Sequence, residues 1–224
     1  MKNTIGIIAK KLGHSLSPCI HNYWSKKYNK NLKYQKFEIS EKKLTKFFEA
    51  FRNNKKFKGF NVTIPYKTNF ISLCDKTTPK AKKIGSVNLV YKKNNLIIGD
   101  NTDVIGFEKS FKKLKKIQPK KILLIGAGGA ARSILYFLNN KNIENIDVFA
   151  TSLRRRENIC KDFSIKNFVT KTSLLKTKYD LIINSSSGGM VGKSPLNRNI
   201  IKLADGAKGV IDIVYNPEMT SLLN

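Results

Sequence analysis

The sequence predicts an α/β protein with an N-terminal β/α domain that has a mixed sheet and a C-terminal doubly wound domain. Short apolar runs alternate with amphipathic helical segments along the whole chain, an order typical of sheets covered by helices. A glycine-rich turn at 126–131 joins an apolar run to a helical one, and a polar stretch with Pro119 precedes it. We therefore predict domains at 1–105 and 106–224.

Composition narrows the classes of function that need to be considered. The chain has 224 residues and a formal net charge of +28, but lysine is spread over every segment without a recognisable nucleic-acid-binding motif. No apolar stretch is long enough for a membrane span or a secretory signal. Cys19, Cys74 and Cys160 are an odd number without a C-x-x-C pair, so neither a disulfide framework nor a metal site is predicted. We expect a cytoplasmic protein that binds neither nucleic acid nor membranes.

The elements of the first domain follow from hydrophobic periodicity. Strands are predicted where short runs are apolar or alternate, at 4–9, 33–39, 57–62, 86–91 and 96–98. Helices are predicted at 17–29 and 41–52, where apolar residues recur at helical spacing.

The second domain repeats a strand-then-helix order. A strand at 121–125 is followed by the glycine turn, a helix at 130–139, a strand at 146–150 and a further helix. Strands at 179–184 and 209–214 complete the series. Consecutive units of this kind predict a parallel sheet with right-handed crossovers.

The turn at 126–131 fits the pattern G-x-G-x-x-A between a strand and a helix. Gly126 permits a tight turn, Gly128 lets the backbone approach a pyrophosphate, and Ala131 allows close helix packing. The N-terminus of the following helix attracts anions through its unpaired N–H groups and its dipole. This predicts a Rossmann-like dinucleotide site, against the alternative of a merely compact strand-to-helix turn.

The end of the second strand of this domain indicates which dinucleotide binds. NAD-binding proteins usually carry an acidic residue there for the ribose hydroxyls, but residues 149–152 contain none. Arginines follow at 154–156 and suit a 2′-phosphate. We predict NADP(H), with Arg155, Thr151 and Ser152 at the phosphate; a solvated helix face is the alternative for the arginines.

Polar residues of the first domain suggest a ligand site. Ser17 is the predicted N-cap of a helix, with Ser15 beside it, and the pair could hold a carboxylate, although on spacing alone ordinary capping explains them better. Asn61 and Thr63 alternate onto one strand face. Pro65 is then expected to start a helix with Lys67 in its first turn; for Lys67 the alternative is a surface lysine.

Taken together, several motifs make the sequence resemble the shikimate dehydrogenase family over nearly its whole length. They occur in the family's order, as H-S-x-S-P, G-x-N-V-T-x-P-x-K, G-x-V-N, G-D-N-T-D-x-x-G, I-G-A-G-G-A-A, N-S-S-S-G-G and D-I-V-Y-N-P. The resemblance implies reversible NADPH-dependent reduction of 3-dehydroshikimate to shikimate, in the biosynthesis of chorismate and the aromatic amino acids. It also implies a substrate-binding and catalytic first domain.

The resemblance assigns roles to particular residues. Lys67 matches the acid/base lysine and Asp103 its partner. The implied substrate-binding set is Ser15, Ser17, Asn61, Thr63, Lys67, Asn88, Asp103 and Tyr215. The implied cofactor-binding set is Gly126, Ala127, Gly128, Gly129, Ala130, Thr151, Ser152, Arg155 and Ile213.

Three departures from the family pattern qualify these roles. Ala150, Thr151 and Ser152 stand where the family usually has N-R-T, and Pro79 stands where some members have an acidic residue. The chain also stops at Asn224, where family members continue, so the second domain is expected to be incomplete. The alternatives are an NAD-using quinate or shikimate dehydrogenase and a non-catalytic protein binding anionic ligands or nucleic acid; a homodimer is one candidate assembly.

Overall fold

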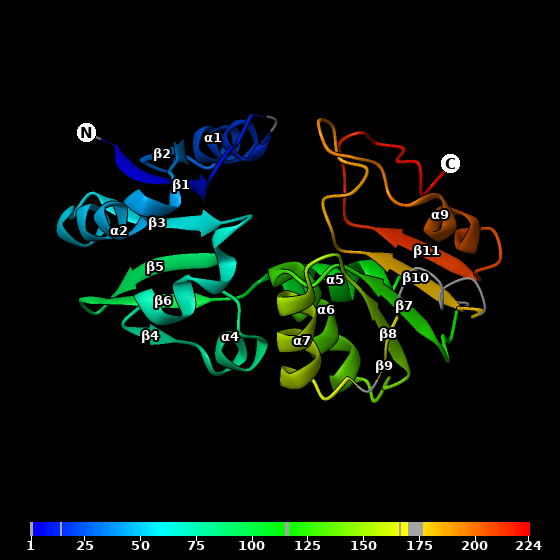
Figure 1. Ribbon diagram of the computed structural model, residues 1–224. Helices are drawn as coiled ribbons and strands as arrows, with labels where there is room; N and C mark the ends of the chain where they lie inside the picture. Colours follow the sequence, from blue (N-terminus) through cyan, green and yellow to red (C-terminus); the bar gives the residue numbers. More distant parts are fainter. Residues whose placement is uncertain (1, 14, 115–116, 166, 170–176) are drawn as a thin grey trace. The chain divides into compact units, whose positions relative to one another are not determined.

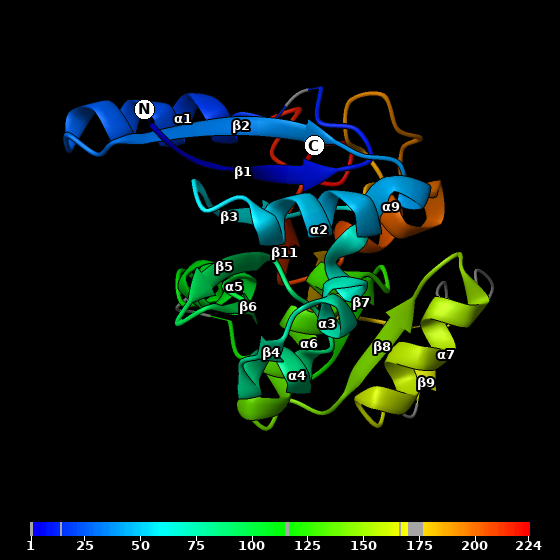
Figure 2. The same cartoon turned by 90° about the vertical axis from the view of Figure 1, so that its left-hand side faces the viewer.

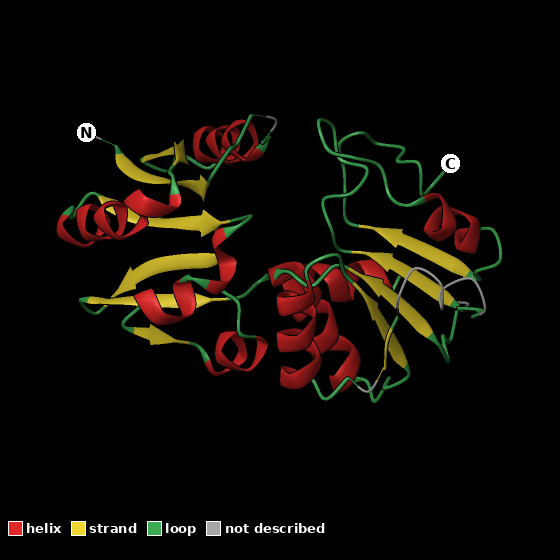
Figure 3. Cartoon of the chain, in the orientation of Figure 1, coloured by secondary structure: helices red, strands yellow, loops and turns green. Residues whose placement is uncertain are grey.

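The computed structural model describes residues 2–13, 15–114, 117–165, 167–169 and 177–224. The chain divides into two compact units, Met1–Thr102 and Asp103–Asn224. Each unit combines a sheet with helices (Figure 3), which confirms the predicted α/β class. Among the described residues, no helix combines the length and apolar character needed to cross a membrane.

The first unit contains a mixed six-stranded sheet (Figure 1). Its strands are β1 (Asn3–Ala9), β2 (Leu32–Glu38), β3 (Phe57–Val62), β4 (Lys76–Thr77), β5 (Leu89–Lys93) and β6 (Leu96–Asp100). They lie in the order β2-β1-β3-β5-β6-β4. Strand β5 runs antiparallel to both of its neighbours, whereas the other pairs are parallel. This mixed sheet is the one predicted.

Helices cover both faces of this sheet. They are α1 (Ser17–Lys27), α2 (Leu44–Asn53), α3 (Phe70–Leu73) and α4 (Pro79–Ile84), with 3₁₀ turns η1 (Glu41–Lys43) and η2 (Tyr66–Thr68). Figure 2 shows α1 and α2 on opposite sides of β1 and β2. Alternation along β1 explains this, because Ile8 joins the phenylalanine-rich core that includes Phe51 of α2, whereas Ile7 joins a cluster with Tyr34.

Local geometry corrects two predictions in this unit. The N-cap of α1 is Leu16, and Ser17 is already the first helical residue. A helical segment does follow Pro65, but Pro65 is its N-cap, and its first turn, which contains Lys67, is the 3₁₀ turn η2, with α3 following at Phe70. Elements as short as α3, α4 and β4 were not predicted, because a few residues cannot display a hydrophobic period.

The second unit contains a five-stranded parallel sheet. Its strands are β7 (Ile122–Ile125), β8 (Ile146–Phe149), β9 (Asn167–Phe168), β10 (Leu181–Asn184) and β11 (Gly209–Asp212). The order β11-β10-β7-β8-β9 corresponds to the first five strands of a doubly wound sheet, read from the other edge. The strand order therefore reverses between β7 and β10, where such sheets bind their ligands.

Helices pack on this sheet through apolar side chains. They are α5 (Asp103–Phe111), α6 (Gly129–Asn140), α7 (Leu153–Asp162) and α9 (Arg198–Ala204). The rings of Phe107 and Phe137 lie 5.4 Å apart and join α5 to α6. Ile200 of α9 belongs to a core cluster with Leu123 of β7. The parallel sheet with covering helices confirms the Rossmann-like prediction.

Candidate functional site

Strand pairing brings polar segments of the first unit to one edge of its sheet. Asn61 near the end of β3 pairs with Leu89 at the start of β5, and Leu89 pairs with Asp100 at the end of β6. Because β5 runs antiparallel, its first residue meets the last residues of its neighbours. Thr63, Asn88 and Thr102 therefore emerge at the same edge.

Ser15 and Ser17 lie in the segment that leads from β1 into α1. The backbone N–H of Ser17 approaches the Ser15 hydroxyl oxygen at 3.4 Å, a long hydrogen bond. The N-cap residue Leu16 makes no side-chain capping bond. Ordinary capping therefore does not explain the Ser17 hydroxyl, whereas Ser15 does accept the N–H of the first helical residue.

A buried tyrosine that the sequence did not single out contacts this region. The Tyr34 hydroxyl donates to Asn61 Oδ1 at 2.8 Å, although the two residues are 27 positions apart. Burial raises the pKa of Tyr34 to about 12, and a hydrogen bond with the Ser17 side chain opposes the rise. Tyr34 thus contacts two of the residues predicted to bind substrate.

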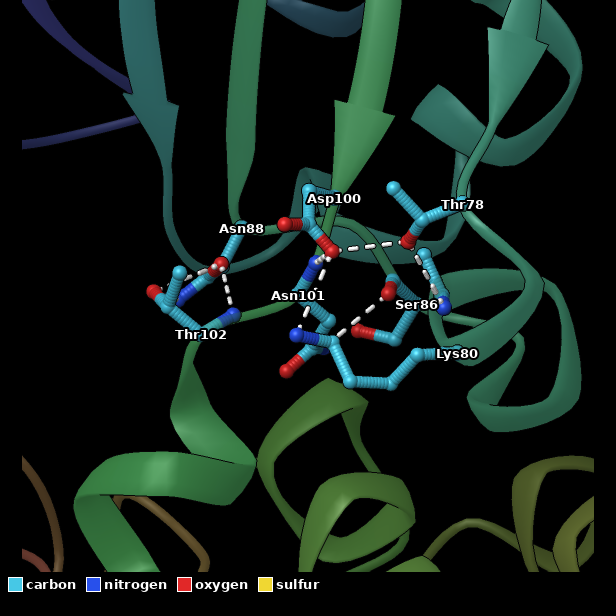
Figure 4. Close-up of polar contacts among 8 residues, drawn as sticks. Thr78, Lys80, Ser86, Asn88, Asp100, Asn101 and Thr102 are labelled. Carbon is cyan, nitrogen blue, oxygen red and sulfur yellow. Dashed lines mark hydrogen bonds and ion pairs between the residues drawn. The ribbon is translucent and has the colours of Figure 1, made fainter.

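Asn88 is buried at the start of β5 and holds the segment after β6 (Figure 4). Its Oδ1 accepts from the Thr102 N–H at 2.8 Å, and its Nδ2 donates to the Thr102 hydroxyl at 3.0 Å. The amide of Asn61 also approaches the Asn88 carbonyl at 3.4 Å. The two bonds with Thr102 fix the side-chain orientation of Asn88.

A second group of contacts in Figure 4 fixes the end of β6. Asp100 Oδ1 accepts from the Thr78 hydroxyl and the Asn101 N–H, each at 2.7 Å, and lies 3.4 Å from the Lys80 ammonium. The buried Asn101 amide donates to the Ser86 carbonyl at 3.0 Å. Since Asp103 follows three positions after Asp100, this cluster fixes the backbone that leads to it.

Thr63 and Lys67 lie on the turn that follows β3. The Thr63 N–H donates to the Ile8 carbonyl at 3.1 Å, and the Lys67 carbonyl accepts from the Val87 N–H at 2.8 Å. Both side chains are half-buried. The turn is therefore anchored to β1 and to the segment before β5, which fixes the backbone that carries Thr63 and Lys67.

In the second unit, the glycine turn lies at the point where strand order reverses. Gly126 has φ +108°, and a Cβ there would lie 2.8 Å from the Ser185 hydroxyl oxygen and 3.0 Å from the Ser186 nitrogen. Gly128 is the N-cap of α6, and a Cβ there would meet no atom within 4 Å. The first glycine is required by the fold, whereas the second faces open space at a helix N-terminus.

The other predicted cofactor residues follow the neighbouring strands. Thr151 and Ser152 are exposed after β8, and Arg155 is exposed in the first turn of α7. Ile213 follows β11 and is 39% exposed, with its N–H donating to the Asn184 carbonyl at 3.1 Å. The strand ends thus present hydroxyl groups, a guanidinium group and an apolar side chain.

The Asn184 and Asp212 side chains brace the ends of β10 and β11. Asn184 Nδ2 donates to Asp212 Oδ1 at 3.0 Å, and Asp212 Oδ2 accepts from the Thr220 hydroxyl at 2.7 Å. Tyr215 lies shortly after β11 with 63% of its surface exposed. The buried network fixes the backbone from which Tyr215 projects.

The structure separates the predicted residues by unit. Within the first unit, Ser17 and Asn61 both form hydrogen bonds with Tyr34, and the Asn61 amide approaches the Asn88 carbonyl. Asp103 and Tyr215 belong to the second unit, as do all the predicted cofactor residues. Among the described residues, no cluster of His, Cys, Asp or Glu could hold a metal ion.

Comparisons with known proteins agree across both units. Residues 7–90 match the model described as the shikimate dehydrogenase substrate binding domain, and residues 108–215 match the model described as shikimate / quinate 5-dehydrogenase. The chain is 35% identical to the shikimate dehydrogenase (NADP(+)) of Pelagibacter ubique, over 100% of this chain and 83% of that one.

Solved structures show the same relationship. The shikimate dehydrogenase of Aquifex aeolicus aligns with a TM-score of 0.85 at 33% identity, covering 99% of this chain and 82% of that one. The shikimate 5-dehydrogenase of Thermus thermophilus, solved in complex with NADP(H) and shikimate, aligns with a TM-score of 0.79 at 27% identity. That alignment covers 100% of this chain and 82% of the other.

Proposed function

The chain belongs to the shikimate dehydrogenase family, and we propose that residues of its first unit bind shikimate while residues of its second unit bind NADP. It is an NADP-dependent oxidoreductase that acts on a CH–OH group and interconverts 3-dehydroshikimate and shikimate. This reaction belongs to aromatic amino-acid biosynthesis. The observation that carries the assignment is that two family models match the two units in turn, at 7–90 and 108–215.

The glycine turn fits a dinucleotide pyrophosphate. The space that a Cβ at Gly128 would enter is open, and the residues of the turn are half-buried at the N-terminus of α6. Backbone N–H groups there can donate to phosphate oxygens, and the dipole of the twelve-residue helix favours an anion. The proposed pyrophosphate-binding set is Gly126, Ala127, Gly128, Gly129 and Ala130.

The residues after β8 support a preference for NADP, which carries a 2′-phosphate, over NAD. Thr151 and Ser152 offer hydroxyl donors, and the Arg155 guanidinium can form charge-assisted hydrogen bonds with a dianion. No carboxylate lies at this strand end to repel the phosphate. We assign Arg155 to the 2′-phosphate and Ile213 to the side of the nicotinamide.

The proposed shikimate site uses the polar edge of the first unit. Ser15 and Ser17 bind the substrate carboxylate at the start of α1, and Thr63 and Asn88 bind ring hydroxyl groups. The full proposed set is Ser15, Ser17, Asn61, Thr63, Lys67, Asn88, Asp103 and Tyr215. The members from the first unit are supported by the convergence of β1, β3, β5 and β6 on one sheet edge, where Asn88 and Asn61 are already held by hydrogen bonds.

Lys67 and Asp103 are the proposed catalytic residues. When bound, NADPH supplies the hydride that reduces the substrate ketone. The Lys67 ammonium donates a proton to the developing alkoxide oxygen, and in the reverse direction the Lys67 amine accepts the hydroxyl proton. Asp103 orients and electrostatically supports the lysine. The hydrogen bond from the Val87 N–H to the Lys67 carbonyl, which anchors the backbone of the η2 turn, supports this role.

The cofactor assignment is tested by shikimate oxidation with NADP⁺ and with NAD⁺. We expect strong preference for NADP⁺, and Arg155→Ala should raise the KM for NADP⁺ by about 5- to 20-fold because a charge-assisted bond is lost. The KM for NAD⁺ should change little. Arg154→Ala, on the same exposed turn, is the matched control. Preference for NAD⁺ in the parent protein would contradict the phosphate assignment.

Two further proposals concern the location and the assembly of the enzyme. We propose that it works in the cytoplasm and that it forms a homodimer. Cell fractionation tests the first, and light scattering of the purified protein tests the second. A monomer at assay concentrations would contradict the homodimer.

A further inference from the structure

Tyr34 is held rigidly in a place from which its hydroxyl reaches the polar sheet edge. The residue is only 4% exposed, on edge strand β2, where it pairs with Ile5 of β1. The Asn22 side chain of α1 accepts from the Tyr34 N–H at 2.8 Å and donates to its carbonyl at 3.0 Å. The Tyr34 ring stacks on His21, with centroids 4.4 Å apart and planes within 4°. Both backbone and ring are therefore fixed against α1.

The Tyr34 hydroxyl connects the start of α1 with β3. Its proton is donated to Asn61 Oδ1 at 2.8 Å, so its remaining capacity is to accept. The hydrogen bond with the Ser17 side chain opposes the rise in the Tyr34 pKa, as expected if the Ser17 hydroxyl is the donor. Tyr34 stays protonated, because burial places its pKa at about 12.

The bond from Tyr34 also decides which way the Asn61 amide faces. With Oδ1 occupied by the tyrosine hydroxyl, Asn61 Nδ2 lies on the side of the Asn88 carbonyl, at 3.4 Å. The Asn88 side chain is in turn fixed by Thr102. One phenolic hydroxyl thus stands at the start of a hydrogen-bonded series that runs through the Asn61 side chain to the backbone carbonyl of Asn88.

We propose that Tyr34 is a positioning residue for shikimate, whose hydroxyl orients the Asn61 amide toward the substrate. The inference rests on the proposed function, because Asn61 is a proposed substrate ligand. Tyr34 acts through this side chain and takes no part in hydride or proton transfer.

Tyr34→Phe tests the role, because it removes the hydroxyl and keeps the ring that stacks on His21. Without this donor the Asn61 amide can turn over. We expect the KM for shikimate to rise about 5- to 10-fold, the effect of about one lost hydrogen bond. The kcat should fall less than about 2-fold, and the KM for NADP⁺ should not change.

Tyr179→Phe is the matched control for a purely structural effect. Tyr179 is also 4% exposed, and its hydroxyl donates to Asp147 Oδ2 at 2.8 Å in the second unit. Both variants should lower the thermal unfolding midpoint, but only Tyr34→Phe should raise the KM for shikimate. An equal rise in both variants would overturn the positioning role.

A coupling measurement shows whether Tyr34 acts through Asn61. In an Asn61→Ala background, Tyr34→Phe should raise the KM for shikimate by less than half of its effect in the parent protein. If Tyr34→Phe raised the KM for shikimate by the same factor in the Asn61→Ala background as in the parent protein, Tyr34 would not act through Asn61.

Calorimetric titration with shikimate separates this inference from the proposed function. In Tyr34→Phe the dissociation constant of shikimate should rise by the same 5- to 10-fold. This is the effect expected from the loss of about one hydrogen bond. An unchanged dissociation constant overturns the role of Tyr34. A parent protein that binds shikimate but does not oxidise it contradicts the catalytic proposal alone, and one that does neither contradicts both.

Discussion

Two glycines of the turn between β7 and α6 should respond in opposite ways to the same substitution. Gly126 has a positive φ and lies against Ser185 and Ser186, whereas Gly128 has extended backbone and open space where a Cβ would project. Alanine at Gly126 should therefore perturb the fold. Alanine at Gly128 should perturb only the binding of a ligand at the turn, here the proposed pyrophosphate.

The magnitudes follow from these surroundings. Gly126→Ala should lower the free energy of unfolding by about 2 to 5 kcal/mol, from backbone strain and from a contact as short as 2.8 Å. Gly128→Ala should change it by less than about 1 kcal/mol, since φ −94° and ψ −170° suit any residue. Displacing a phosphate from one N–H should raise the KM for NADP⁺ about 10- to 100-fold.

Urea unfolding and steady-state kinetics of both variants test this pair. We expect Gly128→Ala to unfold at nearly the same urea concentration as the parent protein. Its KM for NADP⁺ should be much higher, whereas its KM for shikimate should not change. A Gly128→Ala variant that binds NADP⁺ like the parent would refute the assignment of the open space to the pyrophosphate. Equal destabilisation by both substitutions would refute the structural distinction between the two glycines.

Two further predictions concern stability. Phe51 is fully buried, and its ring centroid lies 4.9 Å from that of Phe57 and 4.8 Å from that of Phe60. Phe51→Ala should therefore lower the free energy of unfolding, measured in urea, by about 3 to 5 kcal/mol. A loss below about 1 kcal/mol would contradict this packing. The Lys208 ammonium and the N–H groups of Lys121 and Lys120 lower the pKa of Asp180 from 3.8 to about 2. Because the folded-state pKa lies below the unfolded one, Asp180 stabilises the fold above about pH 4, and this contribution is lost as the pH falls toward 2. Asp180→Asn should therefore unfold more easily than the parent at neutral pH, with the difference shrinking in acid; a difference independent of pH would contradict the ion pair.

Much of the architecture could be predicted from the sequence because its signals are local. The strand at 57–62 coincides with β3, and the G-x-G-x-x-A turn lies between a strand and a helix as predicted. Hydrophobic period and glycine chemistry are visible within about ten residues. The order of the six strands in the mixed sheet was not predicted, because pairing between distant strands leaves no local pattern.

The candidate site shows the same division. Ser15, Ser17, Asn61, Thr63 and Asn88 could be selected from motifs, but their convergence depends on the antiparallel register of β5. Tyr34 was missed because a tyrosine in an alternating strand reads as an ordinary buried residue. Its contact with Asn61 spans 27 positions and arises because β2 and β3 both pair with β1.

The most direct test of the catalytic assignment compares the parent protein with Lys67→Ala in shikimate oxidation by NADP⁺. We expect kcat to fall by about two orders of magnitude or more, while the dissociation constant of shikimate changes much less. Lys82→Ala, on an exposed lysine of α4, serves as the control and should keep the parent's kcat. A Lys67→Ala variant that keeps its kcat within about tenfold, or that loses only affinity, would show that Lys67 is not the proton donor.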